Sequence, residues 1–184
     1  MSDPEDGTRR ARALWKHRGD ARPAFALEPG PGQESVWDYP RPPVIVPDAR
    51  RIRVLADGVT LADTRRSLKV LETASPPTFY LPPADIQTDL LLPIERTTVC
   101  EWKGRARYFS VWLPTRLIET AAWSYLEPFA EFEAIRGFIA FYPNAVECLI
   151  DDERVRRQPG HYYGGWVTSE IVGPFKGEPG TGGW

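Results

Sequence analysis

Short stretches of alternating apolar and polar residues dominate the chain between residues 50 and 150. The segment RRIRVLADGVTLADT predicts two strands joined at Asp57-Gly58, because an Asp-Gly pair between alternating stretches is a strong hairpin signal. SLKVLET continues the pattern as a third strand, and FIAFY, AVECLI and WVTSEIV each predict one more. The pattern therefore predicts a mostly β fold built from short strands.

Two stretches predict short helices instead. Pro83 can begin a helix that runs to about Leu91, because proline is favoured at the first helical position. In FAEFEAIRG the apolar residues recur at helical spacing, and Gly137 suits the end of that helix. We expect these to be the only helical pieces of a compact α+β domain.

The segment TTVCEWKGRARYF predicts a second hairpin, which contains one of the two cysteines. A three-residue loop pairs Cys100 with Tyr108 and collects the apolar side chains on one face, whereas a two-residue turn would mix apolar and charged groups there. In this register Cys100 points inward between aromatic rings, and Lys103 sits at the tip. We expect Cys100 to be a small buried residue, while a pocket-lining role and a nucleophilic role stay open.

Composition supports a single domain with extensions. The 19 prolines and 15 glycines favour strands joined by ordered loops. We expect an N-terminal arm over residues 1–34 that is mobile or draped over a neighbour, a β-rich domain over 35–150 with a proline-rich lead-in, and a glycine- and aromatic-rich extension over 151–184 packed on that domain.

Net charge, hydropathy and the numbers of cysteine and histidine limit which partners, locations and cofactors are expected. A formal net charge of −2 gives no overall attraction to nucleic acid or to an anionic membrane. The sequence shows no apolar run long enough to span a bilayer and no apolar core of a secretory signal, so a cytoplasmic location is expected. Two cysteines and two histidines far apart exclude a structural zinc site, and no motif for a metal or another cofactor is found.

Glu72 is the most informative acidic residue. It follows the apolar stretch LKVL, so it is either the first exposed residue of a turn or an inward group that must be paired because it is buried. A pairing with Lys103 or an arginine would create a site suited to acid–base chemistry. The glycine-rich GPFKGEPGTGGW, in contrast, lacks the order of residues that a phosphate-binding loop requires, and we expect an irregular tail there.

Several separated segments occur in the order found in the domain-of-unknown-function family 427, which the chain resembles over about residues 50–150. They are RIRVLADGVTLADTRRSLKVLETASPPTFYLPPADIQTDLLLP, TTVCEWKGRARYFSV, AWSYLEP and IRGFIAFYP. The flanking WDYPRPP, GGW and GPFKG are similar to extensions of its longer members. The resemblance implies a tent-like antiparallel β domain related to B-type methionine sulfoxide reductases. It also places eight residues at motif positions: Glu72, Tyr80, Cys100, Lys103, Gly104, Tyr108, Trp123 and Tyr125.

Two functions from different classes are compatible with these residues. The first is a domain that binds an unidentified small molecule in an aromatic pocket, with or without catalysis by Glu72, Cys100 or Lys103. The expected lining residues are Glu72, Tyr80, Cys100, Trp102, Lys103, Tyr108, Trp123 and Tyr125. The second is a structural or interaction module, plausibly a homodimer, in which the same aromatic side chains form the core. The discriminating feature is whether these residues surround an open cavity or a filled one.

Overall fold

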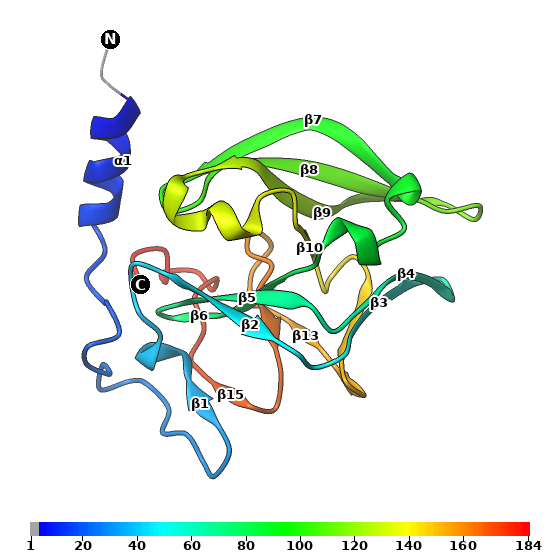
Figure 1. Ribbon diagram of the computed structural model, residues 1–184. Coiled ribbons are helices and arrows are strands. Elements are labelled where there is room, and N and C mark those ends of the chain that lie inside the picture. Colours follow the sequence, from blue (N-terminus) through cyan, green and yellow to red (C-terminus); the bar gives the residue numbers. More distant parts are fainter. Residues whose placement is uncertain (1–3) are drawn as a thin grey trace.

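The protein is described by a computed structural model over residues 4–184 (Figure 1). The helical elements are α1 (Pro4–Ala13) and the short 3-10 helices η1 (Val36–Asp38), η2 (Pro83–Asp85), η3 (Thr88–Leu90) and η4 (Ala130–Ile135). The strands are β1 (Glu34–Ser35), β2 (Val44–Asp48), β3 (Ile52–Ala56), β4 (Val59–Thr64), β5 (Ser67–Glu72), β6 (Ser75–Tyr80), β7 (Leu91–Cys100), β8 (Gly104–Trp112), β9 (Leu117–Pro128), β10 (Ile139–Phe141), β11 (Glu147–Ile150), β12 (Glu153–Arg154), β13 (Arg156–Arg157), β14 (Trp166–Val167) and β15 (Ile171–Val172). The prediction of a mostly β fold is confirmed.

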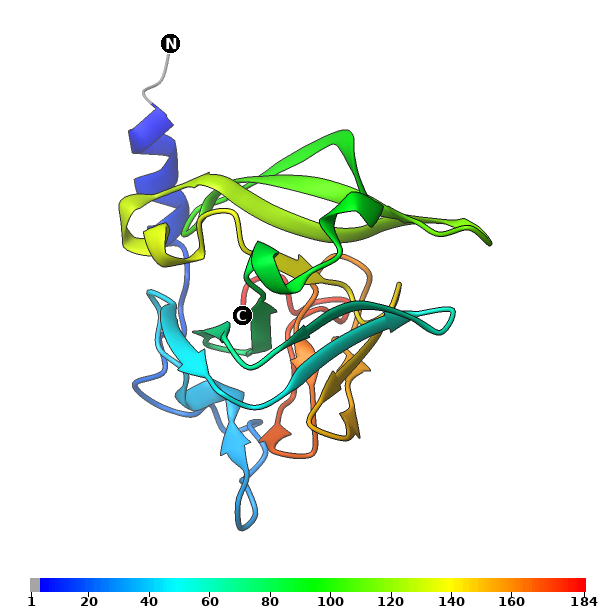
Figure 2. The ribbon, with the colours of Figure 1, turned by 45° about the vertical axis from the view of Figure 1, so that its right-hand side comes forward.

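Three antiparallel sheets form the body of the molecule. Their strand orders are β10-β9-β8-β7, β12-β11-β3-β4 and β2-β5-β6. Figures 1 and 2 show β7 to β10 arching over the strands β2, β5 and β6, and the isolated bridge between Leu81 and Ile139 ties the two layers together. The small sheets β13-β14 and β1-β15 come from the flanks of the chain, and β1 pairs with β15 in parallel.

The hairpin predicted at Asp57-Gly58 is confirmed. Ala56 pairs with Val59 across a two-residue turn, and both turn residues have positive φ, at 49° and 78°. Positive φ at both central residues is what a tight hairpin turn of this hand requires, and Asp and Gly adopt it at low cost. The third predicted strand is β5, but it pairs with β2 and β6 in a separate sheet.

The helix predicted from Pro83 to Leu91 is wrong. The chain makes only η2 and η3 there, and β7 begins at Leu91. Between the two turns the backbone N–H of Gln87 donates to the carbonyl of Leu61 at 2.8 Å, and Ile86 bridges to β4. These contacts hold the segment at a sheet edge. The second predicted helix exists only as η4, a 3-10 helix with a kink inside it, and Gly137 follows it with φ of 70°.

The register predicted for the hairpin around Cys100 is also wrong. Cys100 pairs with Gly104, so the three-residue loop is 101–103, and Tyr108 lies opposite Ile94. A β-bulge between Ile94 and Thr97 shifts the ladder by two residues, and such bulges cannot be read from an apolar pattern.

The interior contains three apolar clusters. The largest is mainly aliphatic and fills the space between the sheets, with Phe79 and Trp166 in contact at its edge. The second is mainly aromatic and lies where β6, β8 and β9 face each other. The third surrounds Trp37, which is fully buried, and joins the N-terminal arm to the C-terminal tail. The second cluster supplies aromatic walls of the site described below.

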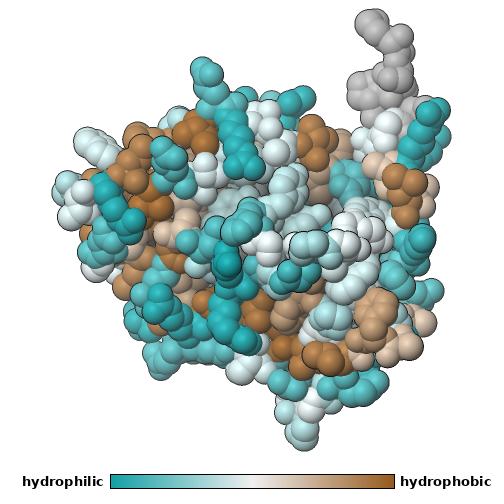
Figure 3. Space-filling model, turned by 180° about the vertical axis from the view of Figure 1, so that it is seen from behind, coloured by the Kyte–Doolittle hydropathy of each residue, from teal (hydrophilic) through white to brown (hydrophobic). Residues whose placement is uncertain are grey.

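The surface does not present one continuous apolar face in the view from behind, where apolar and polar side chains alternate (Figure 3). Large exposed apolar residues include Trp112 and Leu117, which pair near the end of the β8–β9 hairpin. Over residues 4–184, none of the helices combines the length and the apolar character needed to cross a bilayer.

Candidate functional site

Glu72 is the last residue of β5 and lies at the centre of the site. A register shift between Val70 and Glu72 precedes the turn into β6, where Glu72 pairs with Ser75. The side chain of Glu72 is 18% exposed, and its two carboxylate oxygens meet two cations: Oε1 lies 3.3 Å from Nη2 of Arg41, and Oε2 lies 3.6 Å from Nζ of Lys103. Of the two alternatives that the sequence left open for Glu72, the structure shows the inward and paired one.

Lys103 reaches Glu72 because the hairpin tip folds inward and is covered. Lys103 lies in the loop at the hairpin tip, as expected, and it is buried there. Gly104 follows it with φ of 95°, and a Cβ there would lie 3.3 Å from the carbonyl oxygen of Glu127. Helix α1 closes the outside: Nε of Arg12 donates to the carbonyl of Glu101 at 2.7 Å.

Arg41 holds Glu72 from the other side. Its side chain is completely buried and donates to the carbonyls of His17 at 3.1 Å and Thr73 at 2.9 Å, besides its contact with Glu72. The ring of Trp15 lies over the guanidinium at 4.4 Å from its centroid. Arg41 therefore connects the N-terminal arm to the β5–β6 turn, and a buried guanidinium of this kind needs the carboxylate beside it.

Aromatic side chains form the opposite walls. Tyr80 of β6 meets Trp123 of β9 edge-on with ring centroids 6.3 Å apart, and Trp123 packs on Tyr142 at 4.4 Å. Tyr108 shares a hydrogen bond of 2.8 Å with the hydroxyl of Thr98. Burial raises the pKa of Tyr80 to about 12, so its hydroxyl keeps its proton at neutral pH. These rings form rigid walls that carry polar hydroxyl groups.

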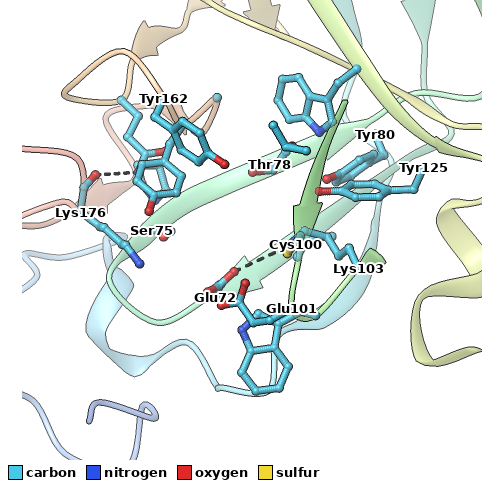
Figure 4. Close-up of a pocket in the computed structure, with 18 of the residues that line it drawn as sticks. Glu72, Ser75, Thr78, Tyr80, Cys100, Glu101, Lys103, Tyr125, Tyr162 and Lys176 are labelled. Atoms are coloured by element: carbon cyan, nitrogen blue, oxygen red, sulfur yellow. Dashed lines mark hydrogen bonds and ion pairs between the residues drawn. The ribbon is translucent and has the colours of Figure 1, made fainter. Parts of the chain in front are cut away.

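Together these groups surround a cavity of about 240 Å³ (Figure 4). All eight lining residues expected from the sequence line it: Glu72, Tyr80, Cys100, Trp102, Lys103, Tyr108, Trp123 and Tyr125. Residues from the two flanks complete the wall: Trp15, Gln158, Tyr162, Tyr163, Gly164 and Lys176. Gly164 passes so close to Trp123 that a Cβ would lie 2.3 Å from its ring, so this approach requires glycine.

Lys176 is one of the cavity residues that the sequence did not predict. It lies in GPFKGEP, which was expected to be an irregular tail, and its spacing to the other site residues carries no motif. The structure buries it, with its backbone N–H donating to the carbonyl of Ala74 at 2.8 Å and its own carbonyl accepting from Nε2 of Gln158 at 2.7 Å. Figure 4 shows its side chain extending toward the space beside Glu72.

The two cavity lysines have opposite electrostatic surroundings. Burial works to lower the pKa of Lys103, but the acidic groups of Cys100 and Glu72 outweigh it, and the pKa ends above its ordinary value. Burial lowers the pKa of Lys176 to about 8, since the opposing effect of Glu72 is too weak to offset it and Arg41 adds to the lowering. Lys103 is thus a fixed cation, and Lys176 is a group that can lose its proton near neutral pH.

The two cysteines are both free, and only Cys100 reaches the cavity. Cys148 is buried in the aliphatic cluster, where burial raises its pKa well above the ordinary value. Within residues 4–184, no three His, Cys, Asp or Glu side chains gather in a way that could hold a metal ion. The chemistry available in the cavity is therefore that of two carboxylates, two amines, a thiol and several phenols.

Comparison with known proteins gives a family for the central part of the chain. Residues 44–152, more than half of the sequence, match the family described as Domain of unknown function (DUF427). A search among curated proteins finds no match. The flanks outside the matched residues contribute six of the residues around the cavity: Trp15, Gln158, Tyr162, Tyr163, Gly164 and Lys176.

Proposed function

The chain belongs to the DUF427 family, and we propose that it binds a small molecule in the cavity between the β2-β5-β6 sheet and the β7-to-β10 sheet. The ligand would have a flat apolar part, which packs against the aromatic walls, and a polar group, which contacts Glu72 and Lys103. Mostly aromatic walls with a few convergent polar groups are typical of small-molecule sites.

The observation that supports this proposal most is a buried ion pair that borders an open cavity. The Glu72–Lys103 pair lies inside the molecule and still lines a cavity of about 240 Å³. Buried ion pairs contribute little net stability compared with apolar packing, so stability alone gives little reason to keep one here. An interaction module whose aromatic residues form core would account for the ring contacts, but it gives no role to charged groups around open space.

In this proposal each polar group has a separate role. Glu72 accepts hydrogen bonds from the ligand, while Arg41 and Lys103 hold the carboxylate in place. Lys103 donates a hydrogen bond to the ligand, and so does the hydroxyl of Tyr80, which burial keeps protonated. Cys100 lies in the same wall, where a bound electrophile would meet its thiol.

Lys103→Met should weaken binding, and a second lysine provides a matched control. Lys69 also lies 3.6 Å from a carboxylate, that of Asp48, but it does not line this cavity. We expect Lys103→Met to weaken binding at least about tenfold, because a hydrogen bond to a charged group is worth about 1.5–3 kcal/mol. Lys69→Met should leave affinity within about twofold.

The measurement is isothermal titration calorimetry with benzamide, benzoate and benzamidine, which share one ring and differ in charge. The proposal expects at least one of them to bind saturably to the wild type and to lose affinity in Lys103→Met only. Equal losses in both variants, or no saturable binding of any of the three, would count against the cavity as a ligand site.

A further inference from the structure

The environment of Lys176 differs from that of every other lysine in the sequence. Lys16 is exposed, Lys69 pairs with Asp48, and Lys103 pairs with Glu72. Lys176 is 3% exposed, and among the described residues no Asp or Glu side chain lies within ion-pair distance of it. It is therefore the one buried lysine of the described chain that is not paired with an Asp or Glu side chain.

Aromatic rings hold this amine in place. Its Nζ lies 3.5 Å from the centroid of Trp15 and 5.3 Å from that of Tyr163, and it is 3.4 Å from a main-chain oxygen of Trp184. The backbone of Lys176 is fixed at both its N–H and its carbonyl. A fixed backbone and two ring contacts thus orient the side chain toward the cavity, and no Asp or Glu side chain of the described residues is paired with it.

The protonation of Lys176 follows from these surroundings. The face of Trp15 favours the ammonium form, whereas burial and the charge of Arg41 favour the neutral amine, and the pKa lies at about 8. At pH 7 such a group is a free amine in about one molecule in ten, against fewer than about one in a thousand for a lysine of ordinary pKa. A free amine is the form that attacks electrophiles.

We propose that Lys176 forms an imine with a small carbonyl compound that enters the cavity, an inference that rests on the proposed function. The nitrogen lone pair attacks the carbonyl carbon, and the carbonyl oxygen takes up a proton to give a carbinolamine. Loss of that hydroxyl as water, together with the remaining nitrogen proton, leaves the carbon–nitrogen double bond. The step requires no oxidant or reductant.

The arrangement of charges favours a neutral carbonyl compound over a simple anion. The carboxylates of Glu72 and Glu101 line the cavity and are offset by the cations of Lys103 and Arg41, so the fixed charges around Lys176 give no net attraction to an anion. Glu101 accepts a hydrogen bond of 2.7 Å from Nε1 of Trp15, the same side chain whose ring covers the amine.

The test is reductive trapping with benzaldehyde and sodium cyanoborohydride on the intact protein at pH 7, followed by peptide mapping. The four lysines of the chain give four distinguishable sites. We expect benzyl groups on Lys176 at least about tenfold faster than on exposed Lys16, with a rate that rises between pH 7 and 9. Paired Lys103, in the same cavity, should stay unmodified.

Two variants and one matched compound separate the outcomes. Lys176→Arg keeps the positive charge and should lose the adduct, while Lys16→Arg should retain it. Benzyl alcohol lacks the carbonyl and reports binding alone through tryptophan fluorescence. Binding of benzyl alcohol without trapping on Lys176 would overturn the imine and leave the proposed function intact. Neither binding nor trapping would overturn both, and equal labelling of Lys16 and Lys176 would overturn the special reactivity of Lys176.

Discussion

Glu72→Gln should lower the free energy of unfolding by about 3 kcal/mol, because removing one partner of a buried ion pair leaves its charge uncompensated. Here one carboxylate serves two cations, and the side chain of Arg41 is completely buried. Glutamine keeps the shape and one hydrogen-bond acceptor, but it cancels no charge. The loss is a large share of the stability of a typical domain, which is about 5–15 kcal/mol.

The control for this variant is Glu101→Gln. Glu101 lines the same cavity, but its side chain accepts a hydrogen bond from Trp15, and glutamine can still accept it. We expect a cost of no more than about 1 kcal/mol there. Urea denaturation at pH 7 measures both values. If the two variants cost the same, Glu72 is not the group that neutralises Arg41 and Lys103.

Trp37→Ala should cost about 4 kcal/mol, the usual range for removing a large aromatic side chain from a packed interior. Trp37 is fully buried, and its ring lies 5.1–5.2 Å from the rings of His17, Phe25 and Trp184, measured between centroids. Its Nε1 donates to the carbonyl of Pro174 at 3.0 Å. One side chain thus joins the N-terminal arm to the C-terminal tail.

Loss of Trp37 should therefore release both flanks at once. Trypsin is expected to cut the arginine-rich segment before Trp37 sooner in the variant than in the wild type. Phe25→Ala is the matched control, because Phe25 touches the same rings but is 48% exposed, and we expect it to cost about 1 kcal/mol. A Trp37→Ala protein with wild-type stability and unchanged proteolysis would show that the flanks are held by other contacts.

The sequence predicted most strands because alternating patterns and Asp-Gly turns are local signals. It failed where a non-local contact decided the structure. The segment after Pro83 carries helix-compatible residues, yet the hydrogen bond from Gln87 to Leu61 fixes it at a sheet edge. The register of the hairpin at Cys100 depends on its loop lying at 101–103, and this tip is in contact with Arg12 and Trp15 of the N-terminal arm, which are distant in the sequence.

The sequence predicted cavity residues of the central domain, but it did not predict those that come from the N-terminal and C-terminal parts of the chain. Lys103 was expected at the hairpin tip, and the sequence did not predict that α1 and Trp15 would contact the loop around it. The ten-residue helix α1 contains few apolar residues, so the apolar pattern of the sequence did not predict it. Lys176 carries no motif and becomes a candidate only when the tail is folded against Trp15.

The central claim is that the cavity binds a small molecule, and the seven tryptophans of the chain can test it directly. Trp15, Trp102 and Trp123 line the cavity, whereas Trp112 and Trp166 do not. In nitrogen-15 NMR titrations with benzamide, benzoate and benzamidine, we expect the indole resonances of the three lining tryptophans to shift saturably with at least one compound, while those of Trp112 and Trp166 stay in place. Shifts confined to exposed Trp112, or no shift with any compound, would contradict the account.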